Sequence, residues 1–410
     1  AEVATIRRWI AAGAPWPDAA RIEPVDRWWS RQPLTTPAVP SVDPEMAARI
    51  RTPIDRFVGQ ALAERGLSFS PHADARTIAR RLYFDLIGLP PTPGQIAEFQ
   101  ERINRWRGAH PTEPPDRLPQ PVVAELVDEL LASPHYGERW ARHWLDVVQY
   151  ADTCGYDKDK LRRNAWPYRD YVIRSFNEDK PYARFIAEQL AGDVLFPGDP
   201  DGILGLGFIA AGPWDFIGHA EVPESKIDGK IARHLDRDNM VANTLNTFCS
   251  TTIQCARCHD HKCDPFTQEH YYGLQAVFAA IDRADRPYNV GPKVAAERAA
   301  LASQIEELRG QLAELEPPPV EPIAQAATIP APPGGREDEA DESQRAVLLE
   351  RLQAAEQRLA ELPDVEFVYA AATEFAPQGT FHPTGGTPRP VHILHRGDIQ
   401  KPGPAALPGA

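Results

Sequence analysis

The residues best suited to chemistry lie in one short run, residues 255–265, with the sequence CARCHDHKCDP. Its first five residues have the pattern Cys-x-x-Cys-His, the spacing that attaches a c-type haem. Two thiols at this spacing can each form a thioether with one haem vinyl group, and the imidazole that follows can bind the iron. The pattern therefore predicts one covalent haem c, with Cys255 and Cys258 as the tethers and His259 as the proximal iron ligand.

The same run allows a second interpretation, a zinc site without haem, because thiolates and imidazoles are ligands that zinc binds tetrahedrally. A redox-active Cys-x-x-Cys pair or an ordinary disulfide is a third alternative. Zinc sites usually pair two separated knuckles, and the chain has no second Cys-x-x-Cys, so haem is the favoured interpretation. The candidate zinc ligands are Cys255, Cys258, His259, His261 and Cys263.

The second axial ligand of the haem iron is left open by the sequence. Met240 is our first choice, because it precedes the motif on a predicted helix and is one of only two methionines. The alternative is that Met240 fills the core. His261 lies too close to His259 to reach the opposite face of the same haem, so we expect a hydrogen-bond donor beside the ligand or a surface residue. The other candidates are His219, His234 and His270, or an open position, which would indicate catalysis rather than electron relay.

A second group of reactive side chains lies in loops and helix starts of the middle of the chain. It combines phenols, carboxylates and a guanidinium, which can bind a polar substrate and move protons. The alternative is that these groups cap helices and pair with Arg139, Arg142 and Arg163. His143, on a tryptophan-rich helix, is predicted to be an interior histidine rather than a ligand. The candidate catalytic residues are Tyr150, Asp152, Asp157, Tyr168, Arg169, Asp170 and Asp193.

The elements that position these residues are predicted to be mainly α-helical. Apolar residues recur at helical spacing, and no segment before residue 365 alternates convincingly like a strand. Thr92, followed by Pro93 and Gln95, has the pattern of a capping box. Residues 196–230 are predicted to be loop. A helix is expected from about residue 238 to 248, and the next is expected to begin at Pro265 with Asp264 as its N-cap.

Length and composition divide the chain. Its 410 residues exceed one ordinary domain, and its 42 prolines are about twice the usual share of ~5 %. The first residues already have helical spacing and show no leader, so we expect a fragment of a longer protein. The expected parts are an upstream domain's tail at 1–17, a proline-rich linker at 18–48, a helical haem c domain at 49–288, an antiparallel, coiled-coil-like helical hairpin at 293–362 with its proline-rich tip at 316–342, and the start of a β-containing C-terminal domain at 365–410.

Charge and hydropathy exclude two classes of partner. The formal charge of −14 argues against nucleic acid or an anionic membrane surface as the main partner. No apolar run approaches the roughly 20 residues that are needed to span a bilayer. We therefore expect no membrane span in this chain and no nucleic acid among its main partners.

Several segments resemble a planctomycete-type cytochrome c-associated family, which is formally a domain of unknown function. Proteins of this family carry a preceding cytochrome c domain and a following partner domain. Residues 1–17 resemble the end of the former, and residues 391–398 resemble the opening of the latter. The resemblance covers about residues 50–285, in the motifs 84–92 (FDLIGLPPT), 136–146 (YGERWARHWLD), 150–153 (YADT), 166–172 (WPYRDYV), 189–193 (QLAGD) and 255–262 (CARCHDHK).

The resemblance implies an exported, periplasmic bacterial protein with covalent haem c at Cys255, Cys258 and His259. Our hypothesis is electron transfer between haems or to a redox partner protein, coupled to oxidation of a carbohydrate bound by the Tyr/Asp/Arg group. An enzyme of this kind would be a haem c-dependent oxidoreductase. The alternatives are a zinc-binding scaffold without redox activity, whose hairpin binds partners, and a hydrolase with a structural haem.

The chain departs from the family pattern at three positions. Gln149 stands where arginine is expected, Cys249 lies in a usually apolar stretch, and Cys263 replaces an aromatic residue. In an oxidising compartment Cys249 and Cys263 can form a disulfide that leaves Cys154 unpaired. The alternative is that both are local substitutions without a role.

Overall fold

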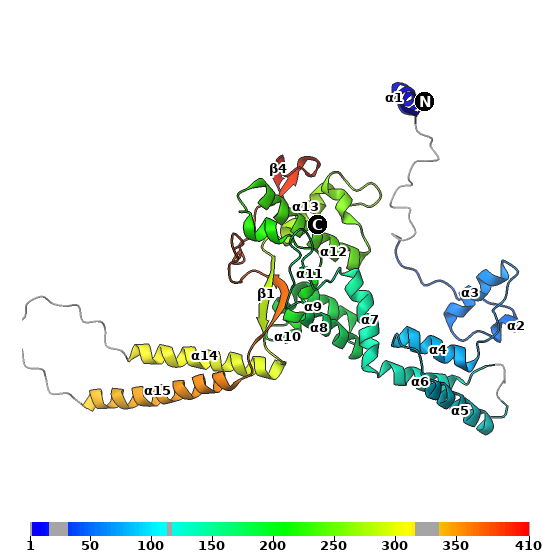
Figure 1. Cartoon of the computed structure of the whole chain (residues 1–410), viewed down its shortest axis with the longest axis horizontal. Coiled ribbons are helices and arrows are strands. Elements are labelled where there is room, and N and C mark those ends of the chain that lie inside the picture. Colours follow the sequence, from blue (N-terminus) through cyan, green and yellow to red (C-terminus); the bar gives the residue numbers. More distant parts are fainter. Residues whose placement is uncertain (1, 16–31, 113–116, 316–335, 410) are drawn as a thin grey trace, which may run out of the picture.

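The computed structural model describes residues 2–15, 32–112, 117–315 and 336–409, and these are mainly α-helical (Figure 1). The described strands form two small two-stranded sheets, so the predicted fold class is confirmed. Residues 16–31 of the predicted linker and 316–335 of the predicted hairpin tip lie outside the described residues. None of the described helices combines the length and the apolar character that a membrane crossing requires.

Local capping residues fix the helix ends in the first part of the chain. The side chain of Asp74 accepts a hydrogen bond from the backbone of Thr77 at 2.7 Å. Thr92 and Gln95 form the predicted capping box, in which each side chain binds the other's backbone N–H. The helices here are α1 (Glu2–Ala11), α2 (Pro44–Ala47), α3 (Pro53–Ala63), α4 (Ala75–Leu86), α5 (Pro93–Ala109), α6 (Gln120–Leu131) and α7 (Pro134–Val147).

The middle of the chain carries more helix than the sequence predicted. The expected loop at 196–230 contains two short helices and a π-helix, and the helix expected from about residue 238 begins at Ile227. The helix expected at Pro265 begins instead at Gln268, because Thr267 rather than Asp264 supplies the capping box. The elements are α8 (Trp166–Asn177), α9 (Tyr182–Leu195), α10 (Pro200–Leu204), α11 (Gly207–Ala210), η4 (Ile217–Glu221), α12 (Ile227–Cys249), η5 (Ile253–Arg257) and α13 (Gln268–Val277).

A strand that the sequence did not predict joins the C-terminal segment to the helical body. β1 (Asp282–Tyr288) pairs antiparallel with β2 (Glu366–Ala372), with Asp282 opposite Ala372. The expectation of no strand before residue 365 is therefore wrong. The strand has the charged sequence DRADRPY, which is typical of a solvent-exposed segment, so its sequence does not indicate a strand. Inside the fold these charges are paired with other residues: Arg286, for example, pairs with Asp193 at 2.8 Å.

The C-terminal segment also covers the motif region. β3 (His392–Leu394) pairs with β4 (Pro402–Ala405), and η6 (His395–Gly397) lies between them. Val391 and Leu394 belong to the same hydrophobic cluster as Ile253 and Ala256, the two buried residues of η5. A Cβ at Gly397 would lie 2.8 Å from the sulfur of Cys258, so the absence of a side chain lets this segment approach the motif.

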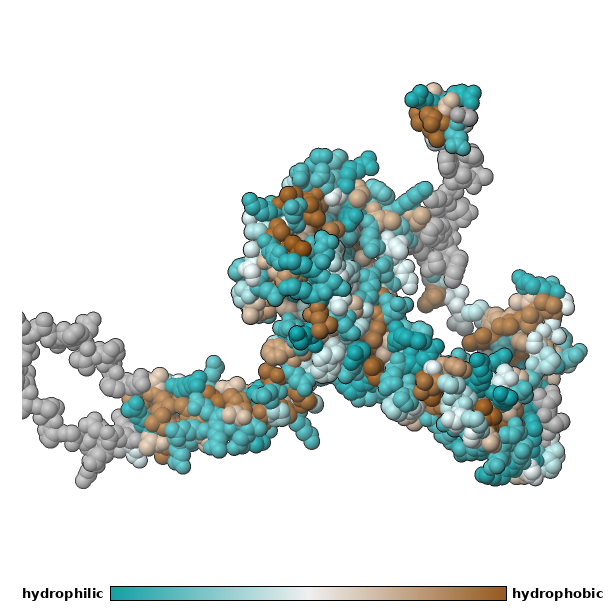
Figure 2. All heavy atoms as spheres, viewed as in Figure 1, coloured by the Kyte–Doolittle hydropathy of each residue, from teal (hydrophilic) through white to brown (hydrophobic). Residues whose placement is uncertain are grey.

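The predicted helical hairpin is present in the described residues. α14 (Pro292–Glu314) and α15 (Arg336–Glu361) lie side by side and project from the body (Figure 1), with hydrophilic and hydrophobic residues mixed along their visible face (Figure 2). Ile305, Leu308 and Leu348 are buried between the helices. α15 starts at Arg336, inside the stretch predicted as the hairpin's tip.

The β1–β2 pairing predicts a measurable contribution of the C-terminal segment to stability. Val368 is fully buried in the main core, and replacing it with alanine should lower the free energy of unfolding by about 2 kcal/mol through lost burial and a residual cavity. Val347→Ala, at a 53 % exposed position of the hairpin, is the matched control and should stay within about 0.5 kcal/mol of the parent. Urea unfolding measures both, and equal effects would place Val368 outside the cooperative core.

Candidate functional site

The Cys-x-x-Cys-His motif lies on a short turn held at its base by buried side chains. α12 ends because Ser250 adopts a left-handed conformation, with φ of 51° and ψ of 36°. The chain then enters η5, where Ile253 and Ala256 are fully buried. Cys255 between them is exposed and Cys258 is partly exposed, so the two predicted tethers face outward from an anchored turn.

The imidazole of His259 leaves one specific nitrogen, Nε2, with a lone pair. It is exposed, and its Nδ1 lies 2.7 Å from the carbonyl oxygen of Asp260. A carbonyl only accepts hydrogen bonds, so Nδ1 carries the proton and Nε2 keeps its lone pair. All five cysteines are free, so the Cys249–Cys263 disulfide is not formed in this structure. Two free thiols followed by an imidazole with a free Nε2 fit the attachment of a c-type haem.

The five candidate zinc ligands are not gathered into a ready site. Among the residues that the structure describes, no group of three or more His, Cys, Asp or Glu is arranged to hold a metal ion. His261 has its Nδ1 occupied, since the backbone N–H groups of Cys263 and Asp264 donate to it at 3.2 and 2.7 Å. Its side chain is only 6 % exposed, so the expectation of a surface residue is wrong, and His261 instead closes the loop after the motif.

The candidates for a second axial ligand lie in different surroundings. Met240 is 1 % exposed and packs in the main core with Val148 and Phe208, a cluster that does not include the residues of η5. Core packing accounts for Met240, and its binding to iron stays a prediction. His270 belongs to the capping box of α13. His219 and His234 are buried beside two pockets on different faces of α12.

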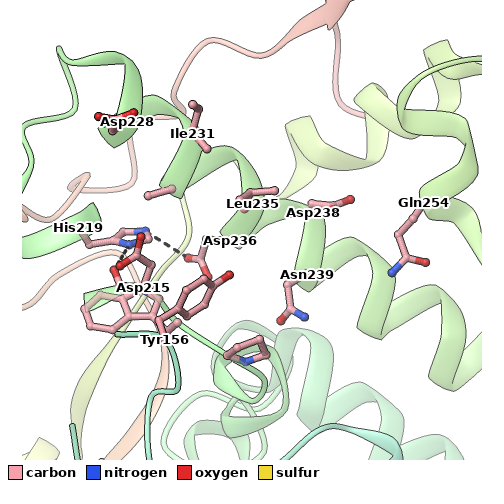
Figure 3. A pocket seen from close by; sticks show the side chains of 13 residues that line it. Tyr156, Asp215, His219, Asp228, Ile231, Leu235, Asp236, Asp238, Asn239 and Gln254 are labelled. Carbon is pink, nitrogen blue, oxygen red and sulfur yellow. Dashed lines mark hydrogen bonds and ion pairs between the residues drawn. The ribbon is translucent and has the colours of Figure 1, made fainter. Parts of the chain in front are cut away.

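A pocket with a volume of about 390 Å³ lies between α12, η4 and the segment around Trp214 (Figure 3). Four carboxylates, an imidazole, two amides and a phenol meet there, and Ile231 and Leu235 provide a partly exposed apolar lip. Figure 3 shows His219, Asp215 and Asp236 close together at one end of the pocket and Gln254 at the other. The polar lining residues are Tyr156, Asp215, His219, Asp228, Asp236, Asp238, Asn239 and Gln254.

His219 is held as a neutral base. Its Nδ1 lies 2.8 Å from the backbone oxygen of Asp215 and must therefore donate, which leaves the lone pair on Nε2. Nε2 is buried, has no hydrogen-bond partner among the described residues, and lies 3.9 Å from a carboxylate oxygen of Asp236. Burial lowers the pKa of His219 below the usual 6.5, and this effect exceeds the opposing influence of Asp236.

A buried arginine behind the pocket contacts two of its lining residues, Asp236 and Asn239. Arg283 on β1 is fully buried, and its Nε lies 2.9 Å from Asp236. Its other nitrogens donate to the backbone oxygen of Ala211 and to Oδ1 of Asn239, both at 2.8 Å. The absence of a side chain at Gly218 lets the carboxylate of Asp215 approach η4, because a Cβ there would lie 2.4 Å from one of its oxygens.

The pocket is joined directly to the Cys-x-x-Cys-His motif. Arg257, the third residue of the motif, pairs with Asp238 of the pocket at 2.9 Å. The hydroxyl of Tyr271 also donates to Asp238. Gln254, another lining residue, immediately precedes Cys255. A ligand in this pocket would therefore lie beside the residues predicted to carry the haem.

The candidate catalytic group predicted from sequence is only partly brought together. The hydroxyl of Tyr150 donates to Asp152 at 2.7 Å, and burial followed by this carboxylate raises the pKa of Tyr150. The ring of Tyr168 lies 6.3 Å from that of Tyr150, but its hydroxyl is in the core and donates to Gln189 at 2.7 Å. Arg169 is paired with its neighbour Asp170 at 3.1 Å.

The remaining members of that group point to structural roles. Asp193 is the partner of Arg286 on β1, and Asp157 is exposed in a loop. His143 is exposed and accepts a hydrogen bond from Arg139 at 2.8 Å, so the prediction of an interior histidine is wrong. The helix carrying it turns this position to solvent and buries Ala141 instead.

The described chain is thus a mainly helical protein in which a Cys-x-x-Cys-His turn lies beside a pocket of carboxylates and one neutral histidine. Residues 53–283, more than half of the chain, match the family PSCyt2, described as a protein of unknown function (DUF1549), and the chain belongs to this family. The match includes the motif and every residue that lines the pocket. The curated proteins and the solved structures yielded no match.

Sequence analysis missed this pocket, although a signal was present. Asp228, Ala232, Asp236 and Asn239 follow one another at spacings of three or four residues, which places them on one helix face. The first part of this stretch was predicted to be loop because residues 196–230 contain several glycines and prolines. His219 lies on the π-helix η4, which is held against α12 by a hydrogen bond from Arg233 to the backbone oxygen of Gly218. This contact joins two elements and is not visible in the local sequence.

The buried state of His219 predicts a pH dependence of stability. Since its folded pKa lies below the unfolded value of about 6.5, the unfolded chain binds more protons between the two values, and the free energy of unfolding falls as the pH falls below about 6.5. One such histidine contributes a slope of at most ~1.4 kcal/mol per pH unit. Asp282, whose pKa burial raises to about 6, acts in the opposite direction and is common to all variants.

Chemical denaturation between pH 5 and 7 measures this slope. His219→Gln should have a shallower slope than the parent, whereas His382→Gln, at an exposed position, should retain the parental slope. Superimposable curves for the parent and His219→Gln would show that His219 titrates as in the unfolded chain.

Proposed function

We propose that this protein is an exported, periplasmic c-type haem protein that passes single electrons to a redox partner and couples this transfer to oxidation of a carbohydrate-like alcohol. The observation that carries the proposal is the presence of two free thiols and a free imidazole Nε2, at Cys255, Cys258 and His259, beside a pocket with a neutral base. A haem c held there would supply a covalently fixed one-electron acceptor.

The pocket is suited to a molecule with several hydroxyl groups. Carboxylates accept hydrogen bonds from hydroxyls, while the amide of Asn239 and the phenol of Tyr156 can also donate. Ile231 and Leu235 can cover the apolar C–H face of a sugar ring. A volume of about 390 Å³ lies in the range of small-molecule sites, so a small saccharide is the substrate class that we propose.

His219 is proposed as the group that accepts a proton from the substrate. Oxidation of an alcohol to a carbonyl releases two protons and two electrons. The proton from carbon passes to water, and the electrons pass in two single transfers to the redox partner. The unprotonated Nε2 of His219 can take the hydroxyl proton, and Asp236, 3.9 Å away, stabilises the imidazolium that results. The backbone oxygen of Asp215 fixes the tautomer in which Nε2 is the base.

The surroundings of the motif support electron exchange with a partner. Cys255 and His259 are exposed, so a redox protein can approach the site closely. The net charge of −14 favours a basic partner through electrostatic steering. The neighbouring parts of the proposed arrangement are an upstream cytochrome c domain and a C-terminal partner domain, as the sequence resemblance implies.

The haem proposal predicts the outcome of a single cysteine substitution. When the protein is exported from a host with c-type haem maturation, it should carry one covalent haem, seen by haem stain on a denaturing gel and by a haemochrome spectrum. Cys258→Ala should lose the two-tether spectrum and most of the stain, because one of the two thioethers cannot form. Cys154→Ala, which removes a buried cysteine far along the chain from the motif, should keep both signals.

Metal analysis of the same preparations separates this proposal from the zinc alternative. Protein without haem that contains zinc, and loses it to a chelator, would be a scaffold rather than an electron carrier. That result would end the electron-transfer proposal.

The pocket proposal predicts that His219 is needed for reduction by substrate but not for haem attachment. On haem-loaded protein, a sugar that reduces the parent should reduce His219→Gln at least about 100-fold more slowly, the usual scale for a general base. Chemical reduction by dithionite should be unchanged. Asp128→Asn, at an exposed position of α6 outside the pocket, is the control, and equal loss of rate in both variants would remove His219 from the reaction.

A further inference from the structure

A second pocket, of about 310 Å³, lies on the other face of α12. Arg233 and His234 follow Lys230 by three and four residues and precede Arg237 by four and three, so all four lie on one helix face, away from the residues that line the first pocket. Tyr272 of α13 and the segment before and after β3 complete the lining. It shares no lining residue with the first pocket, for which the substrate is proposed.

Positive charge dominates the lining. Four cations, Lys230, Arg233, Arg237 and Arg389, face one lining carboxylate, Glu224. That carboxylate is already shared, because its oxygens lie 3.2 Å from Arg233 and 2.9 Å from Arg389. In a protein with a net charge of −14, such a concentration of cations around one cavity indicates a site for an anion.

Arg237 is the cation that the protein itself does not satisfy. Its Nε is buried without a hydrogen-bond partner, and no ion pair joins the side chain to any of the described residues. The nearby carboxylates are committed elsewhere, Asp282 to Arg389 at 3.1 Å and Asp236 to Arg283 at 2.9 Å. Burial, followed by the charge of Arg389, lowers the pKa of Arg237 to about 10, so the guanidinium remains charged at neutral pH.

Two neutral groups in the same pocket also lack partners. Nε2 of His234 and Oε1 of Gln275 are buried and unbonded among the described residues. Burial lowers the pKa of His234 to about 3, so this imidazole is neutral. Buried polar groups are nearly always hydrogen-bonded, and several exceptions lining one cavity point to a polar ligand. Val391, Leu394 and Ile399 line the same cavity and suit a carbon frame.

We infer that this pocket binds a carboxylate, held by the guanidinium of Arg237 and by the imidazole of His234 with its proton on Nε2. Oε1 of Gln275 only accepts, so it takes a hydrogen bond from a hydroxyl group of the same molecule rather than from the carboxylate. A guanidinium and a carboxylate form paired, charge-assisted hydrogen bonds, and such pairing removes the cost of an unpaired buried charge. The apolar side of the cavity receives the rest of the molecule.

The carboxylate has two sources that the structure allows. One is a free organic acid, such as a sugar acid. The other is a propionate of the haem proposed for the motif, because the hydroxyl of Tyr272 donates to the backbone oxygen of Arg257 at 3.0 Å and so places the pocket beside the motif. The two sources differ in one respect, since only the first leaves the pocket open in haem-loaded protein.

Calorimetric titration with sodium glucuronate, at constant ionic strength, tests the inference. The haem-free chain with both Cys255→Ala and Cys258→Ala should bind glucuronate but not glucose, which has the same ring without the carboxylate. Arg237→Gln in that chain should weaken binding at least tenfold, and Arg237→Lys, which keeps the charge without the planar fork, should weaken it less. Arg105→Gln, at an exposed position of α5, is the control and should bind as the parent.

Haem-loaded protein is titrated in parallel to identify the source. Binding to both forms assigns the pocket to a free organic acid, and binding to the haem-free form alone assigns it to a haem propionate. The inference is overturned if neither form binds glucuronate, if glucose binds equally well, or if Arg237→Gln and Arg237→Lys, folded by circular dichroism, bind like the parent. Because the haem-free chain is measured by itself, these outcomes do not depend on the proposed function.

Discussion

The buried ion pair between Arg283 and Asp236 is the interaction on which the site depends. Arg283 comes from β1 and Asp236 from α12, and the guanidinium also binds the backbone of Ala211 and the side chain of Asn239. One side chain thus connects the sheet, the long helix and the segment that leads to η4. Removing one partner of such a pair typically costs about 3–5 kcal/mol, because the other charge remains buried. This contact therefore links α12, which lines both pockets and leads into the motif, to the sheet.

α12 separates two environments of opposite character. One face presents Asp228, Asp236 and Asn239 to the first pocket, and the other presents Arg233 and Arg237 to the second. Its C-terminal end delivers the chain into the motif through the left-handed Ser250. Since a helix has about 3.6 residues per turn, acidic and basic positions that alternate in sequence are sorted onto opposite sides. The motif therefore lies next to both pockets without belonging to either.

The sequence predicted what depends on neighbours in the chain. The capping box at Thr92, the pairing of α14 with α15, and the Cys-x-x-Cys-His turn all follow from spacings of a few residues. The structure confirms the capping box and the paired helices. It failed where a charged residue is neutralised by a distant one. β1 was missed because Arg283 and Arg286 give it the sequence of a solvent-exposed segment. Their acidic partners lie on other elements, on α12 and α9.

The difference between local and distant contacts also explains which functional sites the sequence predicted. The Tyr/Asp/Arg group was predicted from residues close in sequence, and the structure engages much of it in local pairs such as Tyr150 with Asp152. The pocket around His219 unites η4 with α12 and with the segment that precedes the motif. Sequence periodicity cannot predict such a pocket, because its formation depends on which charged residues, distant in sequence, pair when the chain folds. The acidic spacing along α12 was its one visible trace in the sequence.

The distribution of buried charge also argues that the two pockets have ligands. Four arginines, Arg233, Arg237, Arg283 and Arg389, surround α12, and three carboxylates, Glu224, Asp236 and Asp282, are paired with all of them except Arg237. On the opposite face His219 remains unprotonated beside Asp236. An unpaired cation and a buried base with a free lone pair both cost stability, and natural proteins retain such groups mainly where they bind or react. An excess positive charge beside the motif also stabilises the electron-rich state of any redox group held there, whereas the acidic surface favours an approaching partner that is basic.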